Sequence, residues 1–283
     1  MTAQRARLTA QPAAYEAELS IAIDAARRAG RLQMERYERL ERIVHKGPKD
    51  VVTEVDGLSE ELIIATVRRG YPDDVVLAEE SGRSHVVTPH DEGGTAPGAI
   101  EPERLWIVDP LDGTVNYANG IPVFCVSIGL AVGGVPKVGV VYDPVRDEMF
   151  SAVAGRGARL DGAPIRIPLK EQMNDLVLSM AMPSRGWSER ERKIRKRIRV
   201  SRILGSAALS LAYVGNGRFD GFIQAGGLSL WDVCAAGLIA AEGGATVTTR
   251  EGGPWFDISR ASKSIGLVAA APNHHRTLLE LLA

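Results

Sequence analysis

Carboxylates stand beside short apolar runs at four places in this 283-residue chain. The central stretch, residues 109–114, reads Asp-Pro-Leu-Asp-Gly-Thr and follows the apolar run 105–108. It therefore predicts an acid at the C-terminal end of a strand, the edge at which open α/β sheets bind ligands. We interpret the proline as the start of a turn. Asp109 and Asp112 can then share one hard cation or bridge two, with the Leu111 carbonyl as a further oxygen ligand.

Gly113 and Thr114 come next, and backbone N–H groups at a turn or helix start attract phosphate. The segment thus offers metal ligands, phosphate donors and a hydroxyl. Taken alone, the two aspartates are also typical of helix caps and turns. Phosphatases with an aspartyl nucleophile carry Asp-x-Asp-x-Thr, whereas here the acids are three residues apart. This spacing disfavours covalent catalysis by an aspartate.

The other three acidic stretches are 50–56, which reads Asp-Val-Val-Thr-Glu-Val-Asp, the pair Glu79-Glu80, and Trp231-Asp232. Acids next to apolar strands are costly unless they bind cations or cap a helix. Together with the central segment, these stretches resemble the signatures of the inositol monophosphatase family of lithium-sensitive sugar phosphatases. The central signature extends to Asn116 and Tyr117, and the Trp-Asp signature continues through small residues to a Glu-Gly-Gly at 242–244.

The resemblance implies a layered αβαβα sugar-phosphatase fold of the α+β class, two or three Mg²⁺ ions and, as in many members, a homodimer. It also implies residue roles. The implied metal ligands are Glu79, Asp109, the Leu111 carbonyl, Asp112 and Asp232. The implied catalytic residues are Thr114 and Asp56, which would orient the attacking water, and Glu79, which would help with a third ion. The implied phosphate- and substrate-binding residues are Asp112, Gly113, Thr114, Gly205, Ser206 and Ala207.

Hydrophobic periodicity predicts the elements that position these residues. We expect helices over 14–37, from 56 onward, and over 206–214, 231–241 and 272–282. We expect strands over 75–77, 105–108, 149–154, 176–180, 219–223 and 264–270, and a hairpin made of 123–132 and 136–142. The mixed order favours α+β or α/β layers. We divide the chain into an N-terminal α+β metal-binding half, 1–160, and a C-terminal α/β half, 161–283, that completes the active site.

Composition narrows the function classes. The formal net charge is −1 and 45% of residues are hydrophobic, so no global field attracts nucleic acid or a membrane surface. We find no signal peptide or membrane-spanning run. Cys125 and Cys234 lie in apolar surroundings and are expected to be buried, reduced thiols. We therefore expect a cytoplasmic protein. All five histidines (45, 85, 90, 274 and 275) are interpreted as surface residues.

The substrate is less well specified. Inositol-preferring relatives often carry a Glu about seven residues before the site Asp, where this chain has Ala225. We expect a small polyol or sugar phosphate as the partner, with inositol 1-phosphate ranked first. The alternatives are fructose 1,6-bisphosphate, histidinol phosphate and 3′-phosphoadenosine 5′-phosphate.

Two further segments have open roles. The basic segment 190–199 is interpreted as a solvated face, a contact for a second phosphate, or a patch for RNA or protein. Nucleic acid is not the favoured partner. Residues 85–103 are rich in Gly and Pro and predict a loop, which either covers the site or lies on the surface.

Overall fold

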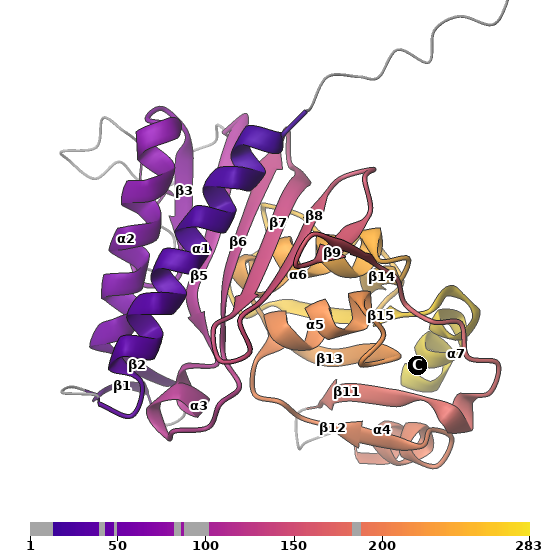
Figure 1. The fold of residues 1–283 in the computed structure, drawn as a ribbon. Coiled ribbons are helices and arrows are strands. Elements are labelled where there is room, and N and C mark those ends of the chain that lie inside the picture. Colours follow the sequence, from indigo (N-terminus) through magenta and orange to yellow (C-terminus); the bar gives the residue numbers. More distant parts are fainter. Residues whose placement is uncertain (1–13, 40–42, 48–49, 82–85, 88–101, 183–187) are drawn as a thin grey trace, which may run out of the picture.

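The computed structural model describes residues 14–39, 43–47, 50–81, 86–87, 102–182 and 188–283. Within these residues, helices and sheets alternate in five layers (Figure 1). Helices α1 (Glu16–Arg36) and α2 (Glu54–Gly70) cover one face of a large sheet, and α5 (Ala207–Gly215) and α6 (Leu230–Glu242) lie between that sheet and a second one. Helices α4 (Ser188–Arg195) and α7 (Pro272–Leu282) form the last layer. The predicted αβαβα architecture is confirmed.

Among the described residues the first sheet has eight strands in the order β10-β9-β8-β7-β6-β5-β3-β4. Their bounds are β3 Val75–Ala78, β4 Val86–Val87, β5 Arg104–Asp112, β6 Cys125–Val132, β7 Val135–Asp143, β8 Glu148–Val153, β9 Ala158–Leu160 and β10 Ala163–Ile165. Strand β5 pairs in parallel with β3 and antiparallel with β6. A separate two-stranded ribbon joins β1 (Ile43–Gly47) to β2 (Asp50–Thr53).

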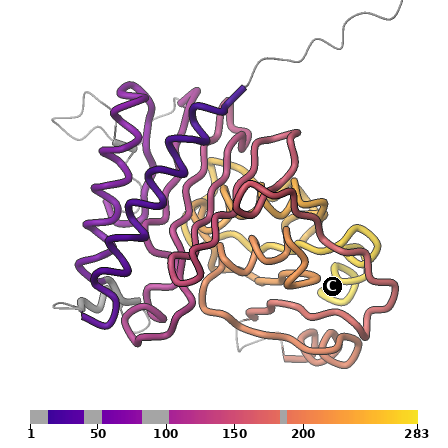
Figure 2. The backbone as a smooth tube through the Cα atoms, in the orientation of Figure 1, coloured from indigo at the N-terminus to yellow at the C-terminus, as the bar shows by residue number. Residues whose placement is uncertain are grey.

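In the part of the chain that the structure describes, the second sheet has five strands in the order β12-β11-β13-β15-β14. Their bounds are β11 Val177–Ala181, β12 Val200–Arg202, β13 Gly221–Leu228, β14 Thr246–Thr249 and β15 Ile265–Ala270. A single turn of 3₁₀ helix, Met173–Asp175, precedes β11, and a short helix α3 (Thr114–Ala118) follows β5. Figure 2 lets the reader follow the chain from the first sheet into the second. The division at residue 160 stays a prediction.

Three apolar clusters fill the four interfaces between the five layers, because the second cluster spans two of them. The first packs α1 and α2 onto the large sheet and contains Trp106. The second joins that sheet to α5, α6 and the second sheet and contains Trp231. The third packs α4 and α7 against the outer face of the second sheet. The middle cluster holds both halves of the chain together, which matters because the acidic residues come from both.

Close packing of α6 depends on glycines in the large sheet. A Cβ added at Gly129 of β6 would lie 2.6 Å from the Cys234 sulfur, and one at Gly139 of β7 would lie 2.6 Å from the Ala235 carbonyl oxygen. Such distances are far below van der Waals contact, so a side chain at either position would push the helix away. The small residues thus bring the first turn of α6, with Asp232, close to β5.

Most predicted elements are confirmed, with three corrections. Helix α2 begins at Glu54, before Asp56, because Thr53 caps it. The pairing of β5 continues to Asp112, so the predicted turn at Pro110 is instead an irregularity inside a strand. Val86–Val87 form β4 within the predicted 85–103 loop; most of that loop lies outside the described residues. None of the described helices is long and apolar enough to cross a membrane.

Candidate active site

Three aspartates meet where β5 ends. Asp109 and Asp112 belong to β5, and Asp232 is in the first turn of α6. Each offers one carboxylate oxygen to a group whose atoms all lie within 4.8 Å of one another. Asp109 and Asp112 are buried and Asp232 is partly buried. Residues from the two halves of the chain therefore form one cluster of oxygen ligands.

The irregular end of β5 turns both of its acids toward this cluster. The pairing with β6 joins Asp109 to Ser127 and then shifts register before joining Asp112 to Cys125. In a regular strand, residues three apart face opposite sides of the sheet. The irregularity removes that constraint. Within it, the Leu111 N–H donates to Asp109 Oδ1 at 3.1 Å.

Asp112 is held by the second half of the chain. Its Oδ2 accepts hydrogen bonds from the Ser206 hydroxyl at 2.6 Å and from the Ala208 N–H at 2.7 Å, both at the start of α5. The Cys125 thiol lies 3.8 Å from the same oxygen. These donors fix the carboxylate through Oδ2. The predicted substrate segment 205–207 is therefore in direct contact with a predicted metal ligand.

Asp232 and Asp56 occupy equivalent positions in two helix capping boxes. The Ser229 N–H donates to Asp232 Oδ2 at 2.6 Å, and the Thr53 N–H donates to Asp56 Oδ2 at 2.8 Å. Each acid is the third residue of its helix and satisfies the backbone of the cap residue. In each case, the backbone N–H of the residue three positions earlier therefore fixes one carboxylate oxygen.

Thr114 connects Asp56 to the central segment. Its hydroxyl lies 3.0 Å from Asp56 Oδ1 and 2.9 Å from the Leu111 carbonyl oxygen. Gly113, before it, has φ +96°, and an added Cβ would lie 2.9 Å from the Val123 carbonyl oxygen. Only glycine fits this left-handed, crowded position easily. The first N–H groups of α3, which have no acceptor within the helix, follow at once.

Burial raises the pKa values of all three aspartates, and neighbouring acids add to the shift for Asp109 and Asp232. Burial, followed by the charges of Glu79, Asp112 and Asp232, raises the pKa of Asp109 well above its usual range. Burial and the charge of Asp112 raise the pKa of Asp232 to about 7. Burial also raises the pKa of Asp112, although hydrogen bonds from Ser206 and Ala208 oppose the shift. Such mutual repulsion in a buried site favours a bound cation or proton.

The Glu79–Glu80 pair sits at the end of β3, beside β5. The Glu79 N–H donates to the Val108 carbonyl at 3.2 Å, which continues the ladder to the edge of the cluster. The next N–H, that of Glu80, donates to the buried Glu60 Oε2 at 2.7 Å. Glu60 comes from α2, one helical turn after Asp56, and burial raises its pKa. Sequence reasoning missed it, although its i, i+4 relation to Asp56 was a signal.

Asn116 was recognised only as part of a signature, and the structure gives it a contact. Its Nδ2 donates to the carbonyl oxygens of Val123 at 2.7 Å and Leu204 at 2.8 Å. It therefore ties α3 to the segment that leads into Ser206. An added Cβ at Gly205 would lie 2.8 Å from the Asn116 amide nitrogen, so the glycine makes room for this bridge.

The donor set fits Mg²⁺. It consists of carboxylate oxygens, the ligands this hard cation prefers, and three or four suffice because Mg²⁺ retains several waters. Cys125 is buried beside Asp112, and burial raises the pKa of its thiol well above the usual range, which disfavours a thiolate ligand. Both cysteines are free and buried, as predicted.

Two histidine predictions are wrong. His274 and His275 are buried in the first turn of α7. His274 Nε2 lies 2.7 Å from the Lys170 carbonyl oxygen, and His275 Nε2 lies 3.1 Å from the Thr248 hydroxyl. They share the buried face of α7 with Leu278 and Leu282, a spacing that could have been read from the sequence. The side chains of the other three histidines lie outside the described residues.

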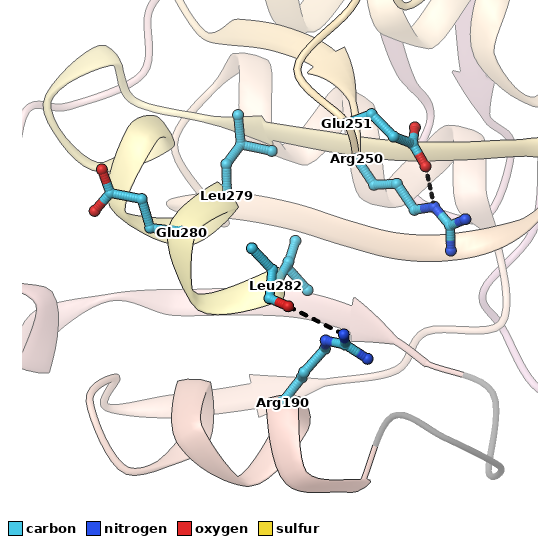
Figure 3. A pocket seen from close by; sticks show the side chains of 7 residues that line it. Arg190, Arg250, Glu251, Leu279, Glu280 and Leu282 are labelled. Atoms are coloured by element: carbon cyan, nitrogen blue, oxygen red, sulfur yellow. Dashed lines mark hydrogen bonds and ion pairs between the residues drawn. The ribbon is translucent and has the colours of Figure 1, made fainter.

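A cavity of about 540 Å³ lies at the α4–α7 end of the molecule (Figure 3). Its arginines are already engaged. Arg190 donates to the Ala283 carbonyl at 3.0 Å, and Arg250 pairs with Glu251. None of the clustered acids lines it. The candidate chemistry is therefore at the end of β5 and not in this cavity.

Most of the basic segment 190–199 is exposed, but Arg190 and Glu191 are partly buried. Ile194 and Ile198 pack into the third apolar cluster. Ion pairs engage several of its cations: Lys193 with Glu189 at 3.3 Å, Arg195 with Glu191 at 2.7 Å and Arg199 with Asp175 at 2.6 Å. These pairs reduce its net field, as expected for a solvated face.

Comparison with known proteins agrees with this geometry. A sequence profile of the inositol monophosphatase family matches residues 15–283. The chain belongs to the inositol monophosphatase family. The chain is 34% identical to inositol monophosphatase 1 from Solanum lycopersicum over 274 residues, which cover 94% of each protein.

Other relatives of the chain bear a different name. The chain is 38% identical over 269 residues to Nus factor SuhB from Pasteurella multocida, covering 92% of this chain and 94% of that protein. A crystal structure of extragenic suppressor protein suhB from Bartonella henselae superposes with a TM-score of 0.83 at 32% identity, covering 94% of this chain and 98% of that one. Family membership and fold are thus shown, while similar relatives carry two functional names.

Proposed function

We propose that the protein is a Mg²⁺-dependent phosphomonoester hydrolase for small polyol or sugar phosphates, with inositol 1-phosphate favoured. The observation that carries the proposal is the cluster of Asp109, Asp112 and Asp232 next to the hydrogen-bonded pair Thr114 and Asp56. Carboxylates for cations, backbone donors for phosphate and a hydroxyl–carboxylate pair for water lie within one short segment and its neighbours. Hydrolysis by activated water needs these three elements.

Each group has an assigned task in the proposal. Glu79, Asp109, the Leu111 carbonyl, Asp112 and Asp232 hold two or three Mg²⁺ ions, which when bound supply charge neutralisation and Lewis-acid activation. The N–H groups of Gly113 and Thr114 bind the phosphate oxygens. Gly205, Ser206 and Ala207 border the alcohol part of the substrate.

Asp56 and Thr114 act on the attacking water. The Thr114 hydroxyl lies within hydrogen-bond distance of two acceptors, Asp56 Oδ1 and the Leu111 carbonyl oxygen, which share its single proton. Burial raises the pKa of Asp56 to about 6, although Thr53 donates to it. A carboxylate with such a pKa accepts a proton near neutral pH more readily than an exposed aspartate does. Asp56 is therefore the relay or base in the proposal.

Phosphate release tests the reaction. We expect activity that requires Mg²⁺, disappears with EDTA and falls at least about 10³-fold in Asp112→Asn, since that change removes a charged ligand worth several kcal/mol. Asp24→Asn, the same change on the exposed face of α1, serves as a matched control and should retain full activity. Full turnover of Asp112→Asn, or of wild type in EDTA, would refute the mechanism.

A substrate panel tests the selectivity. Ala225 is buried on β13 and offers no side-chain hydrogen bond. Compared with a relative that has Glu at this position, a ring hydroxyl of inositol phosphate therefore loses one charge-assisted hydrogen bond, worth about 1.5–3 kcal/mol. We therefore expect inositol 1-phosphate to lead by a modest margin in kcat/KM over fructose 1,6-bisphosphate, histidinol phosphate and 3′-phosphoadenosine 5′-phosphate. A preference of 10³-fold or more for one of the alternatives would replace inositol phosphate as the proposed substrate.

A second function is suggested by the relatives named Nus factor SuhB and by the exposed Arg192, Lys196 and Arg197. We expect weak, salt-dependent RNA retention that falls when these three are changed to Gln, since each phosphate contact adds to the salt slope. A control with Arg27, Arg69 and Arg166 changed to Gln carries the same net charge. Equal loss in both variants would mean nonspecific attraction.

Light scattering on the same samples tests the proposed homodimer.

A further inference from the structure

The buried face of α1 contains one polar side chain that core packing does not explain. Its other buried residues are small: Ala22, Ala25, Ala26, Ala29 and Gly30. Gln33 lies on the same face and is 0% exposed. A buried amide lowers the stability of the folded state unless it is hydrogen-bonded. An apolar side chain at this position would fill the same space in the core without that penalty. The reason for the glutamine must lie in its contacts.

The amide reaches the acidic segment. Gln33 Nε2 donates to the Pro110 carbonyl oxygen at 2.7 Å, across 77 positions of sequence. Pro110 lies inside the irregularity of β5, after the last residue paired with β3 and between the two acids paired with β6. The Gln33 side chain thus donates a hydrogen bond to a backbone carbonyl at the point where the regular pairing of β5 with β6 is interrupted.

The contact continues through one peptide group to a carboxylate. The Pro110 carbonyl and the Leu111 N–H belong to the same planar unit. On one side that unit accepts from Gln33, and on the other it donates to Asp109 Oδ1 at 3.1 Å. Rotation of the plane would break both hydrogen bonds together. Hydrogen bonds in such a chain also polarise one another.

Two more observations agree with a role in orientation. The Tyr117 hydroxyl donates to the Gln33 backbone carbonyl at 2.7 Å, so α3 holds α1 at this point. Gln33 Oε1 is buried without a hydrogen-bond partner among the described residues. A buried acceptor left unsatisfied is unfavourable for stability alone. The amide is therefore retained for its donor.

We propose that Gln33 is a positioning residue for Asp109. Through the peptide between Pro110 and Leu111 it fixes one oxygen of the Asp109 carboxylate and so presents the other oxygen to a divalent cation. The inference rests on the proposed function, in which the acidic cluster binds Mg²⁺. It extends the site to a helix that contributes none of the proposed ligands.

The test compares Gln33→Met with wild type by titrating each full-length protein with Mn²⁺ or Mg²⁺ in a calorimeter. Methionine keeps the length and unbranched shape but removes the donor. We expect the dissociation constant for the cation to rise about tenfold or more, as for other groups that orient metal ligands. Turnover should recover at saturating Mg²⁺, because the ligand is misoriented and not lost.

The control is Ile63→Val, which loosens the same α1–α2 layer without touching the 109–112 segment. It should lower thermal stability while leaving cation affinity within about twofold of wild type. If Gln33→Met also keeps wild-type affinity, Gln33 is structural only and the inference fails alone. If wild type binds no cation, the proposed function fails as well. Should Gln33→Met not fold, Gln33→Asn withdraws the amide by one methylene, and the same outcomes apply.

Discussion

The two ends of β5 handle buried carboxylates in opposite ways. At the first end, Asp74 accepts from Arg104 Nε at 2.9 Å and from Trp106 Nε1 at 2.8 Å. At the other end, Asp109 and Asp112 face Asp232. The chain itself compensates the first acid with a cation and a ring N–H, whereas the second group gathers like charges. The paired Asp74 therefore stabilises the fold. The clustered aspartates repel one another and are stabilised by a bound cation or proton.

The contrast between the two ends predicts opposite effects of removing one charge. Asp109→Asn should lower phosphate release at least about 10³-fold, because it removes a proposed cation ligand. The same change should raise the melting temperature of the metal-free protein, since burial and neighbouring acids make the charge unfavourable. Phosphate release and calorimetry in EDTA measure both. A variant that keeps a tenth of the activity would show that Asp109 is not a ligand.

At the compensated end, Asp74→Asn should lower the free energy of unfolding by about 3 kcal/mol, the lower end for a broken buried pair, because Arg104 remains partly exposed. Urea unfolding measures the loss. Turnover of the folded fraction at low temperature should stay within about twofold of wild type. A stable but inactive Asp74→Asn would contradict the division of roles between the two ends.

The acidic cluster also sets a pH dependence. The pKa of Asp232 is raised to about 7, above the value of about 3.9 for an unfolded chain. Between these values the folded, metal-free protein binds the extra proton, so this residue makes the free energy of unfolding fall as pH rises from about 4 to about 7. Asp232→Asn should show a flatter profile in EDTA. The free energy of unfolding is measured by urea titration at pH 5 and at pH 7.5 for both proteins. If it changes equally between these pH values in wild type and in Asp232→Asn, the result argues against the raised pKa.

The smallest expected effect concerns the neutral donors around Asp112. Cys125→Ala removes only the weak thiol contact at 3.8 Å, while Ser206 and Ala208 keep their shorter hydrogen bonds. Activity should change less than about threefold, and stability should fall by about 1 kcal/mol for the lost volume. Ser206→Ala, which removes the hydroxyl donor, should cost more. Phosphate release ranks the two variants, and the reverse order would make the thiol the main support of Asp112.

The sequence predicted what depends on neighbouring residues. The acids of the 109–114 segment, the start of α6 and the central hairpin were found because spacing and turn-forming residues are local signals. The family resemblance implied that Asp232 joins Asp109 and Asp112 and that Thr114 acts with Asp56. Three other contacts between distant residues were not predicted: Gln33 with Pro110, Glu60 with Glu80, and Ser206 with Asp112. Each depends on how layers pack, which a single sequence does not encode in any short window. Strands β9 and β10 were missed because three residues give no clear period.

The capping boxes of Asp56 and Asp232 bear on how quickly the site can form. Each carboxylate is oriented by the N–H of a residue three positions earlier, so its direction is set when the first turn of its helix forms. Helical turns form within about a microsecond, long before sheets with distant partners assemble. When the sheets assemble later in folding, they therefore bring together segments in which Asp56 and Asp232 already have their final orientation. Evolution can likewise retune the layers around these turns while each acid keeps its orientation.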